Sequence, residues 1–243
     1  MASVAFQGIS LQLPPHLPRA RPRWWEARGG LRQGRLGLDV LHELDAPPAV
    51  TGIAGLAFPC SLPRPFLEFL DIVGSRKEEL RALAARTPSR LFHDARAFAS
   101  RTPRGRKQPR RTADESESAL ERRRLARFAA SLPLLRRTAT PPWDEADPPY
   151  GFEVDPPALL KALDLPATGL TGSSAGAIEQ RARILAALAE GRLGAPLDLA
   201  GRDLAVASPG ALEAVCAACA AAWVDASGTK PPPGPVEAWI PLP

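Results

Sequence analysis

The sequence predicts an α/β fold, in which helices cover both faces of a β-sheet. The first observation is a nearly uninterrupted apolar run at 49–58, "AVTGIAGLAF", which is typical of a strand covered on both faces. The second is the alternating, β-branched character of residues 3–13, followed at 23–44 by the pattern of a strand, a Gly-rich turn and a strand. The third is a C-terminal third with helical spacing of apolar residues. A chain of 243 residues suits one domain over 1–243 or two smaller ones, and one is the simpler expectation.

The first half of the chain supplies the expected strands. Residues 3–13, "SVAFQGISLQL", form a strand that Pro14 and Pro15 stop. Residues 23–44 are then expected as a strand, a turn around Gly29–Gly34 and a second strand, which together make a hairpin. The buried strand at 49–58 follows the turn signal "DAPP".

The middle of the chain alternates between helix and loop. Residues 76–87 and 118–135 have helical composition, whereas 98–117 is polar, basic and interrupted by prolines, so we expect a mobile loop there. This loop contains a basic cluster: Arg101, Arg104, Arg106, Lys107, Arg110 and Arg111.

The C-terminal third shows the clearest helix signals. A short strand at 151–154 ends before Asp155, an expected N-cap, with Pro156 at the first helical position. A second helix is expected at 174–190. A third begins at the cap Ser208 and buries one stripe, formed by Leu212, Val215, Cys216, Cys219 and Trp223. The proline-rich tail at 230–243 is expected to be extended.

Composition narrows the function classes. The net charge of +5 and the pI near 9.6 favour an acidic partner, most often nucleic acid, although an arginine excess is also typical of GC-rich genomes. Charged residues and prolines interrupt the apolar runs, and a secretory signal pattern is not evident, so we expect a cytoplasmic protein without a membrane partner. The Cys216-x-x-Cys219 pair lacks a second pair or a nearby histidine, which favours core packing over zinc or redox chemistry.

The order of motifs resembles a known family. The segments "FEVDPPALLKALDLPATGLTGSSAGAIEQRARILAAL", "SPGALEAVCAACAAAW" and "EAWIPLP" resemble the C-terminal half of a bacterial and archaeal family of predicted nucleases with a ribonuclease-H-like fold. Matches to "FQGISL", "GLAFPCSLP" and "RRTAD" extend the resemblance toward the N-terminus. It implies a mixed sheet, with an antiparallel hairpin on one side, parallel strands after it, and helices on both faces.

The resemblance also implies where the acidic residues of the family would lie. The family has aspartates at the positions of Ser10, Ala57 and Gly210, a second helix aspartate at Glu213, and a strand-end glutamate retained here as Glu153. The family lysine before the long helix is Thr171. Nucleases of this fold hold two Mg²⁺ or Mn²⁺ ions with a cluster of carboxylates, so Glu153 and Glu213 are the candidate catalytic and metal-binding residues. Asp155 is a candidate third ligand, although helix capping is the favoured role, and Asp39 is another possible ligand.

Three hypotheses for function follow. With two family carboxylates retained, we expect metal-dependent phosphodiesterase activity to be lost or weakened, with the scaffold kept to bind nucleic acid or a protein. Arg104, Arg106, Lys107, Arg110 and Arg111 are the candidate nucleic-acid contacts. The alternatives are an active two-metal nuclease that uses Glu153 and Glu213, and a structural or interaction protein that does not bind nucleic acid. The sequence does not predict the oligomeric state.

Other candidate sites have weaker signals. Gly172-Ser173-Ser174 precedes a helix and favours an ordinary cap over a phosphate site, because a Walker lysine does not accompany it. Ser61 lacks the Gly-x-Ser-x-Gly elbow of hydrolases. His93 adjoins Asp94 but has no identified nucleophile, so a position on a surface helix is favoured.

Overall fold

The structure is a computed structural model of the whole chain, and it describes residues 5–13, 22–60, 62, 64–101, 117–137 and 149–228. The tail at 230–243, Ser61 and most of the loop expected at 98–117, including its candidate nucleic-acid contacts, lie outside these residues.

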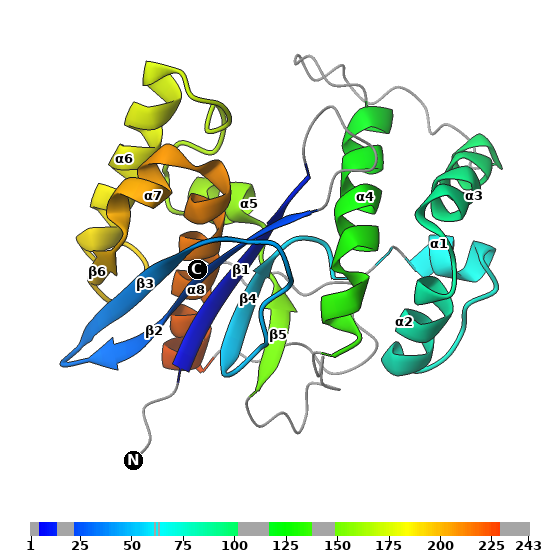
Figure 1. Cartoon of the computed structure of the whole chain (residues 1–243), viewed down its shortest axis with the longest axis horizontal. Helices are drawn as coiled ribbons and strands as arrows, with labels where there is room; N and C mark the ends of the chain where they lie inside the picture. The colour runs from blue at the N-terminus through cyan, green and yellow to red at the C-terminus, as the bar shows by residue number, and fades with distance from the viewer. Residues whose placement is uncertain are drawn as a thin grey trace.

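A six-stranded mixed sheet lies at the centre of the fold, with strand order β5-β4-β1-β2-β3-β6 (Figure 1). Its strands are β1 (Ala5–Gln12), β2 (Arg23–Arg32), β3 (Arg35–Leu44), β4 (Ile53–Ala57), β5 (Tyr150–Glu153) and β6 (Leu197–Ala200). The β1-β2-β3 meander is antiparallel, whereas β4 is parallel to β1, β5 to β4, and β6 to β3. The fold is therefore α/β with a mixed sheet, as the sequence predicts.

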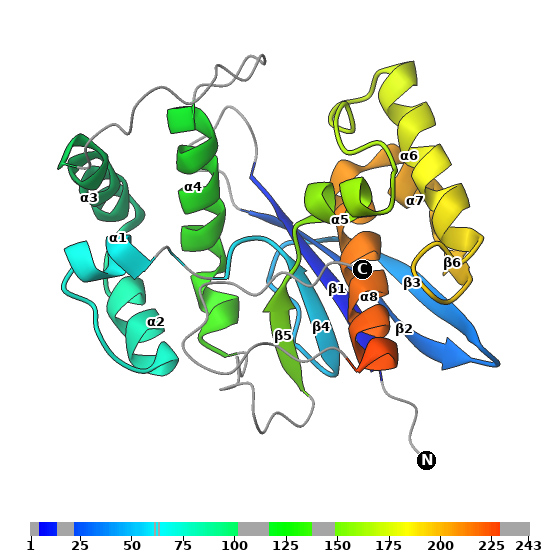
Figure 2. The same cartoon turned by 180° about the vertical axis from the view of Figure 1, so that it is seen from behind.

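Two hydrophobic clusters cover the two faces of the sheet. One face packs against α5 (Pro156–Ala162), α6 (Ala175–Ala189), α7 (Arg202–Ala207) and α8 (Pro209–Ser227). The other packs, over part of its width, against α1 (Arg64–Phe69), α2 (Arg76–Ala84), α3 (Pro88–Arg101) and α4 (Glu117–Leu135). In Figure 2, α8 lies across the sheet, and α1–α4 stand beyond β4 and β5.

The last helix is the core of the molecule. It packs on β1, β2 and β4, and nearly every residue from Gly210 to Val224 is buried, with Glu213 and Trp223 as the exceptions. The predicted single buried stripe is therefore wrong, because α5 and α7 cover the side of α8 that faces away from the sheet. By length and composition α8 is the one described helix that could span a membrane, and most of it is buried inside the protein.

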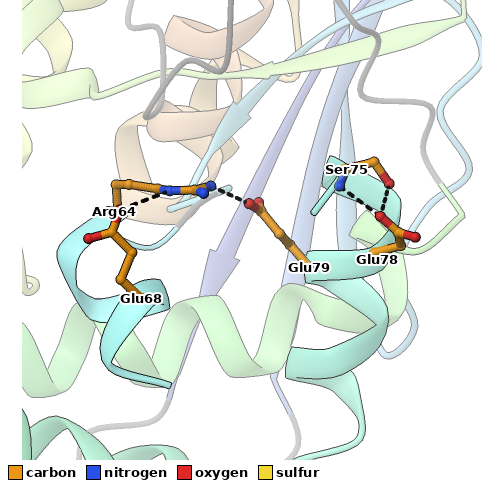
Figure 3. Close-up of polar contacts among 5 residues, drawn as sticks. All are labelled: Arg64, Glu68, Ser75, Glu78 and Glu79. Carbon is orange, nitrogen blue, oxygen red and sulfur yellow. Dashed lines mark hydrogen bonds and ion pairs between the residues drawn. The ribbon is translucent and has the colours of Figure 1, made fainter. Parts of the chain in front are cut away.

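Helices α1 and α2 are joined by an ion pair. The guanidinium of Arg64 lies 2.9 Å from the carboxylate of the buried Glu79 and 3.4 Å from that of Glu68 (Figure 3). At the start of α2, the hydroxyl and the amide of Ser75 both donate to the Glu78 carboxylate at 2.8 Å. These bonds stabilise the charged carboxylate and lower the pKa of Glu78.

Helix signals in the C-terminal third are confirmed. Asp155 accepts from the Ala158 amide and caps α5, Ser174 caps α6, and Ser208 caps α8 with Pro209 at the first position. Cys216 and Cys219 are buried, and burial raises the pKa of both thiols, that of Cys219 to about 12. They are core residues, as expected.

Several predicted boundaries are wrong for identifiable reasons. The hairpin turn is formed by Gln33 and Gly34, both with positive φ, whereas Gly29 lies inside β2, where its backbone closely approaches Gly37 across the hairpin. Helix α3 continues to Arg101, so the expected loop at 98–117 starts inside a helix. Strand β4 is shorter than the apolar run at 49–58, and the sequence did not predict β6.

Candidate functional site

Three of the predicted positions lie on three neighbouring strands. In the sheet register Ser10 of β1 is opposite Ala57 of β4, and Leu56 of β4 is opposite Glu153 of β5. All three are close to the carboxyl ends of parallel strands, which is the edge where α/β sheets bind ligands. Strand pairing thus brings together residues that are far apart in the chain.

Helix α8 adds Glu213 to this edge. The helix approaches β1 and β4 closely, because Gly8 and Gly55 have no side chains to hold it off. Glu213 lies in the first turns of α8, and its Oε2 accepts a hydrogen bond from the Ser10 hydroxyl at 2.7 Å. Ser10 is completely buried, so the carboxylate of Glu213 is fixed against the sheet on one side.

A cation from the opposite layer completes the cluster. Arg127 extends from α4, and one of its terminal nitrogens donates to Glu213 Oε2 at 2.8 Å and to the Ala57 carbonyl oxygen. About a quarter of each charged side chain remains exposed, 28% for Arg127 and 27% for Glu213. We call Ser10, Ala57, Arg127 and Glu213 the Arg127–Glu213 centre. Its one positive and one negative charge balance each other.

The guanidinium of Arg127 is not fully satisfied there. Its Nε is buried and has no hydrogen-bond partner among the residues that the structure describes. A buried donor without a partner disfavours the position by roughly 1–3 kcal/mol, which the ion pair with Glu213 and the bond to the Ala57 carbonyl offset. Arg127 is therefore held by its ion pair with Glu213 and by a hydrogen bond to the Ala57 carbonyl, both made by the same terminal nitrogen.

Glu153 is held apart from this centre. Phe152 and Val154 pack in the cluster on the α8 face, so alternation along β5 directs the Glu153 side chain to the opposite face. There its carboxylate accepts a hydrogen bond from the Cys60 amide at 2.8 Å, and the residue is 6% exposed. In the described part of the chain, no three His, Cys, Asp or Glu side chains gather closely enough to hold a metal ion.

The other candidate acidic positions add no carboxylate to the Arg127–Glu213 centre or beside Glu153. Asp155 uses its Oδ1 to cap α5. Asp39 is exposed on β3, where it is opposite Arg28 of β2, and β2 separates it from Ser10. At Gly210 a Cβ would lie 2.5 Å from Trp25, so an aspartate would not fit there without displacing that ring.

Two weaker candidates have structural roles. Asp94 is bound by Arg86 at 2.8 Å and Arg90 at 3.1 Å, and His93 beside it is largely exposed on α3, as the sequence favoured. The carbonyl of Gly172 accepts from the buried Arg181, and Ser174 caps α6. Both contacts hold the loop before α6 in place.

Arg127 was not among the residues predicted for the site, because the family motifs imply carboxylates there. A signal does exist in the sequence: Arg127 is the single charged residue in the apolar stretch Leu125–Leu135 of α4. A lone charge on an apolar helix face needs a partner in the core. That reasoning identifies an internal ion pair but not its partner.

Comparisons with known proteins do not assign the chain to a family. No family model, no curated protein and no solved structure matches it.

Proposed function

We propose that this chain is a divergent ribonuclease-H-like protein that binds nucleic acid and does not cut it. The strand order supports the fold: an antiparallel meander, β1-β2-β3, is continued by the parallel strands β4 and β5 on the other side of β1. This is the mixed sheet that the motif resemblance implies. The additional strand β6 extends the sheet beyond β3.

The contact between Arg127 and Glu213 is the observation that carries the proposal. Two-metal cleavage needs several carboxylates around two adjacent cations. Here the carboxylate of Glu213 is bound by a guanidinium, and Glu153 leaves the sheet on the other face. A fixed positive charge at the strand ends repels divalent cations, so the residues present do not fit Mg²⁺ or Mn²⁺.

Charge supports a nucleic-acid partner over a neutral one. The chain carries a net charge of +5, and the pairing of Arg127 with Glu213 leaves that excess elsewhere on the molecule. The arginines and lysine of the basic cluster, Arg104, Arg106, Lys107, Arg110 and Arg111, are candidate phosphate contacts. A protein partner without nucleic acid is the competing function that the test below separates.

The test combines cleavage with binding. Labelled RNA, DNA and an RNA–DNA hybrid are incubated with the protein in Mg²⁺ or Mn²⁺, and binding of the same probes is followed by fluorescence polarisation at increasing salt. We expect salt-sensitive binding and no cleavage above the buffer rate. Cleavage that disappears in both Glu153→Gln and Glu213→Gln would mean an active nuclease. Failure to bind any probe at low salt would favour the interaction protein.

A further inference from the structure

One part of the sheet is left without helices. The face of β2 and β3 turned away from α8 has no described helix over it, and Figure 1 shows this hairpin standing clear of α1–α4. Because Leu36, Leu38 and Val40 pack on the α8 side, the alternate residues of β3 point to the open side. With their partners on β2 they form what we call the hairpin face: Arg28, Gly30, Arg32, Arg35, Gly37 and Asp39.

The arginines of the hairpin face are exposed and unpaired. Arg28, Arg32 and Arg35 make no hydrogen bond or ion pair with any residue that the structure describes. Arg32 and Arg35 are directly opposite each other beside the turn, a like-charge pairing that disfavours a hairpin. Asp39 is opposite Arg28, and Asp198 of β6 is next to Gly37, so the face has a small net positive charge. An anion bound between the arginines would relieve their repulsion.

Two glycines lie between these arginines and leave the middle of the hairpin face without side chains. Gly30 and Gly37 are opposite each other, and a Cβ at Gly37 would meet nothing closer than 3.9 Å. By contrast, a Cβ at Gly8 would lie 1.8 Å from the Ala214 carbonyl oxygen, so that glycine is needed for packing. The fold has no such need for Gly37. A strand-interior glycine that packing does not require is typical of a surface that a ligand approaches closely.

We infer that the hairpin face binds the sugar–phosphate backbone of nucleic acid. This inference rests on the proposed function and identifies the surface that contacts the nucleic acid. Guanidinium groups bind phosphate oxygens through two parallel hydrogen bonds. The absence of side chains at Gly30 and Gly37 lets the nucleic-acid backbone lie close to the strands. The face carries no large apolar side chain that would insert into a membrane. The Arg32–Arg35 end of the face also lies away from the Arg127–Glu213 centre, because seven residues of β2, about 23 Å, separate Arg32 from Trp25, which is opposite Ser10.

The experiment is fluorescence polarisation with labelled single-stranded DNA, RNA and a duplex of equal length, over a range of salt. The variant replaces Arg28, Arg32 and Arg35 with Gln. Its control replaces the exposed Lys161 of α5, Arg192 in the turn after α6 and Arg202 of α7 with Gln, which removes the same charge elsewhere. We expect the hairpin variant to weaken binding at least about tenfold at low salt and to reduce the slope of log K against log salt by about 2. The control variant is expected to bind within about threefold of the wild type.

A second variant tests the role of Gly37 without changing the charge of the hairpin face. Gly37→Thr fits the open space and improves strand propensity, so the hairpin is expected to keep its thermal stability while binding falls several-fold. Equal losses of affinity in the arginine variant and its control would contradict binding at the hairpin face and leave the proposed function standing. Wild-type protein that binds no probe, or that binds anionic lipid vesicles in place of nucleic acid, would overturn both.

Discussion

Arg181 is completely buried on α6, and its guanidinium donates only to backbone carbonyls among its described contacts. The acceptors are Leu170 and Gly172 before α6, and Val206 and Ala207 at the end of α7, at 2.5–3.2 Å. Burial lowers the pKa of Arg181, since water is removed from the charged group. The side chain therefore ties the loop before α6 to the end of α7 through four backbone carbonyls.

Replacing Arg181 with Met should lower the free energy of unfolding by about 3–5 kcal/mol, because all four backbone carbonyls lose their charged donor together. Urea denaturation measures the change. Arg183→Met is the matched control on the same helix: Arg183 is exposed and pairs with Glu179 at i, i+4, so its loss should change stability by less than about 1 kcal/mol. Similar values for the two variants would show that the four carbonyls do not depend on Arg181.

Arg127 and Arg181 show that a sequence pattern does not predict the partners of a single buried side chain. The apolar environment of Arg127 is visible in the stretch Leu125–Leu135, but its acceptors Ala57 and Glu213 are distant in the chain. Strand pairing and helix packing bring them together. Glu213 was expected as a candidate metal ligand, whereas in the structure it is bound by Arg127, which no local signal connects to it.

At the element scale, α8 lies against β1 and β4 with little space between their backbones. A Cβ on Gly8 would lie 2.4 Å from the Ala218 nitrogen, and one on Gly55 would lie 2.2 Å from the Ala217 carbonyl oxygen. The alanines of α8 and the glycines of the sheet are therefore complementary. This close approach brings Glu213 to within hydrogen-bond distance of Ser10.

Gly8→Ala is expected to destabilise the protein by roughly 3 kcal/mol or more, since the methyl group would force α8 away from β1. Gly37→Ala is the matched control in the same sheet, with open space for the methyl group, and should be neutral or stabilising by about 0.5 kcal/mol. Thermal unfolding followed by circular dichroism compares the two. A tolerated Gly8→Ala would contradict the close contact of α8 with β1.

Local signals predicted elements well, and long-range pairing explains the failures. The caps Asp155, Ser174 and Ser208 act within three residues of their partners, so the sequence carries their full signal. Strand β6 has four residues and exists through its pairing with β3, a contact with no local signature. Gly29 resembled a turn residue, but its role is a close cross-strand approach that depends on the hairpin register.

At the scale of the whole molecule, the sheet order brings the expected positions to one edge. Ser10, Ala57 and Glu153 are on adjacent strands, and α8 adds Glu213. The sequence predicted an α/β sheet with helices on both faces, and the motif resemblance named these positions. Neither predicted that Glu153 would leave the sheet on the opposite face or that an arginine would bind Glu213, because both depend on packing between the two layers.

We propose that the Arg127 guanidinium stands where divalent cations would have to bind. Titration of the folded protein with Mn²⁺, followed by the electron paramagnetic resonance signal of the free ion, tests it most directly. We expect wild-type protein and Glu213→Gln both to leave this signal undiminished at millimolar Mn²⁺. Saturable loss of the signal in the wild type that disappears in Glu213→Gln would contradict it.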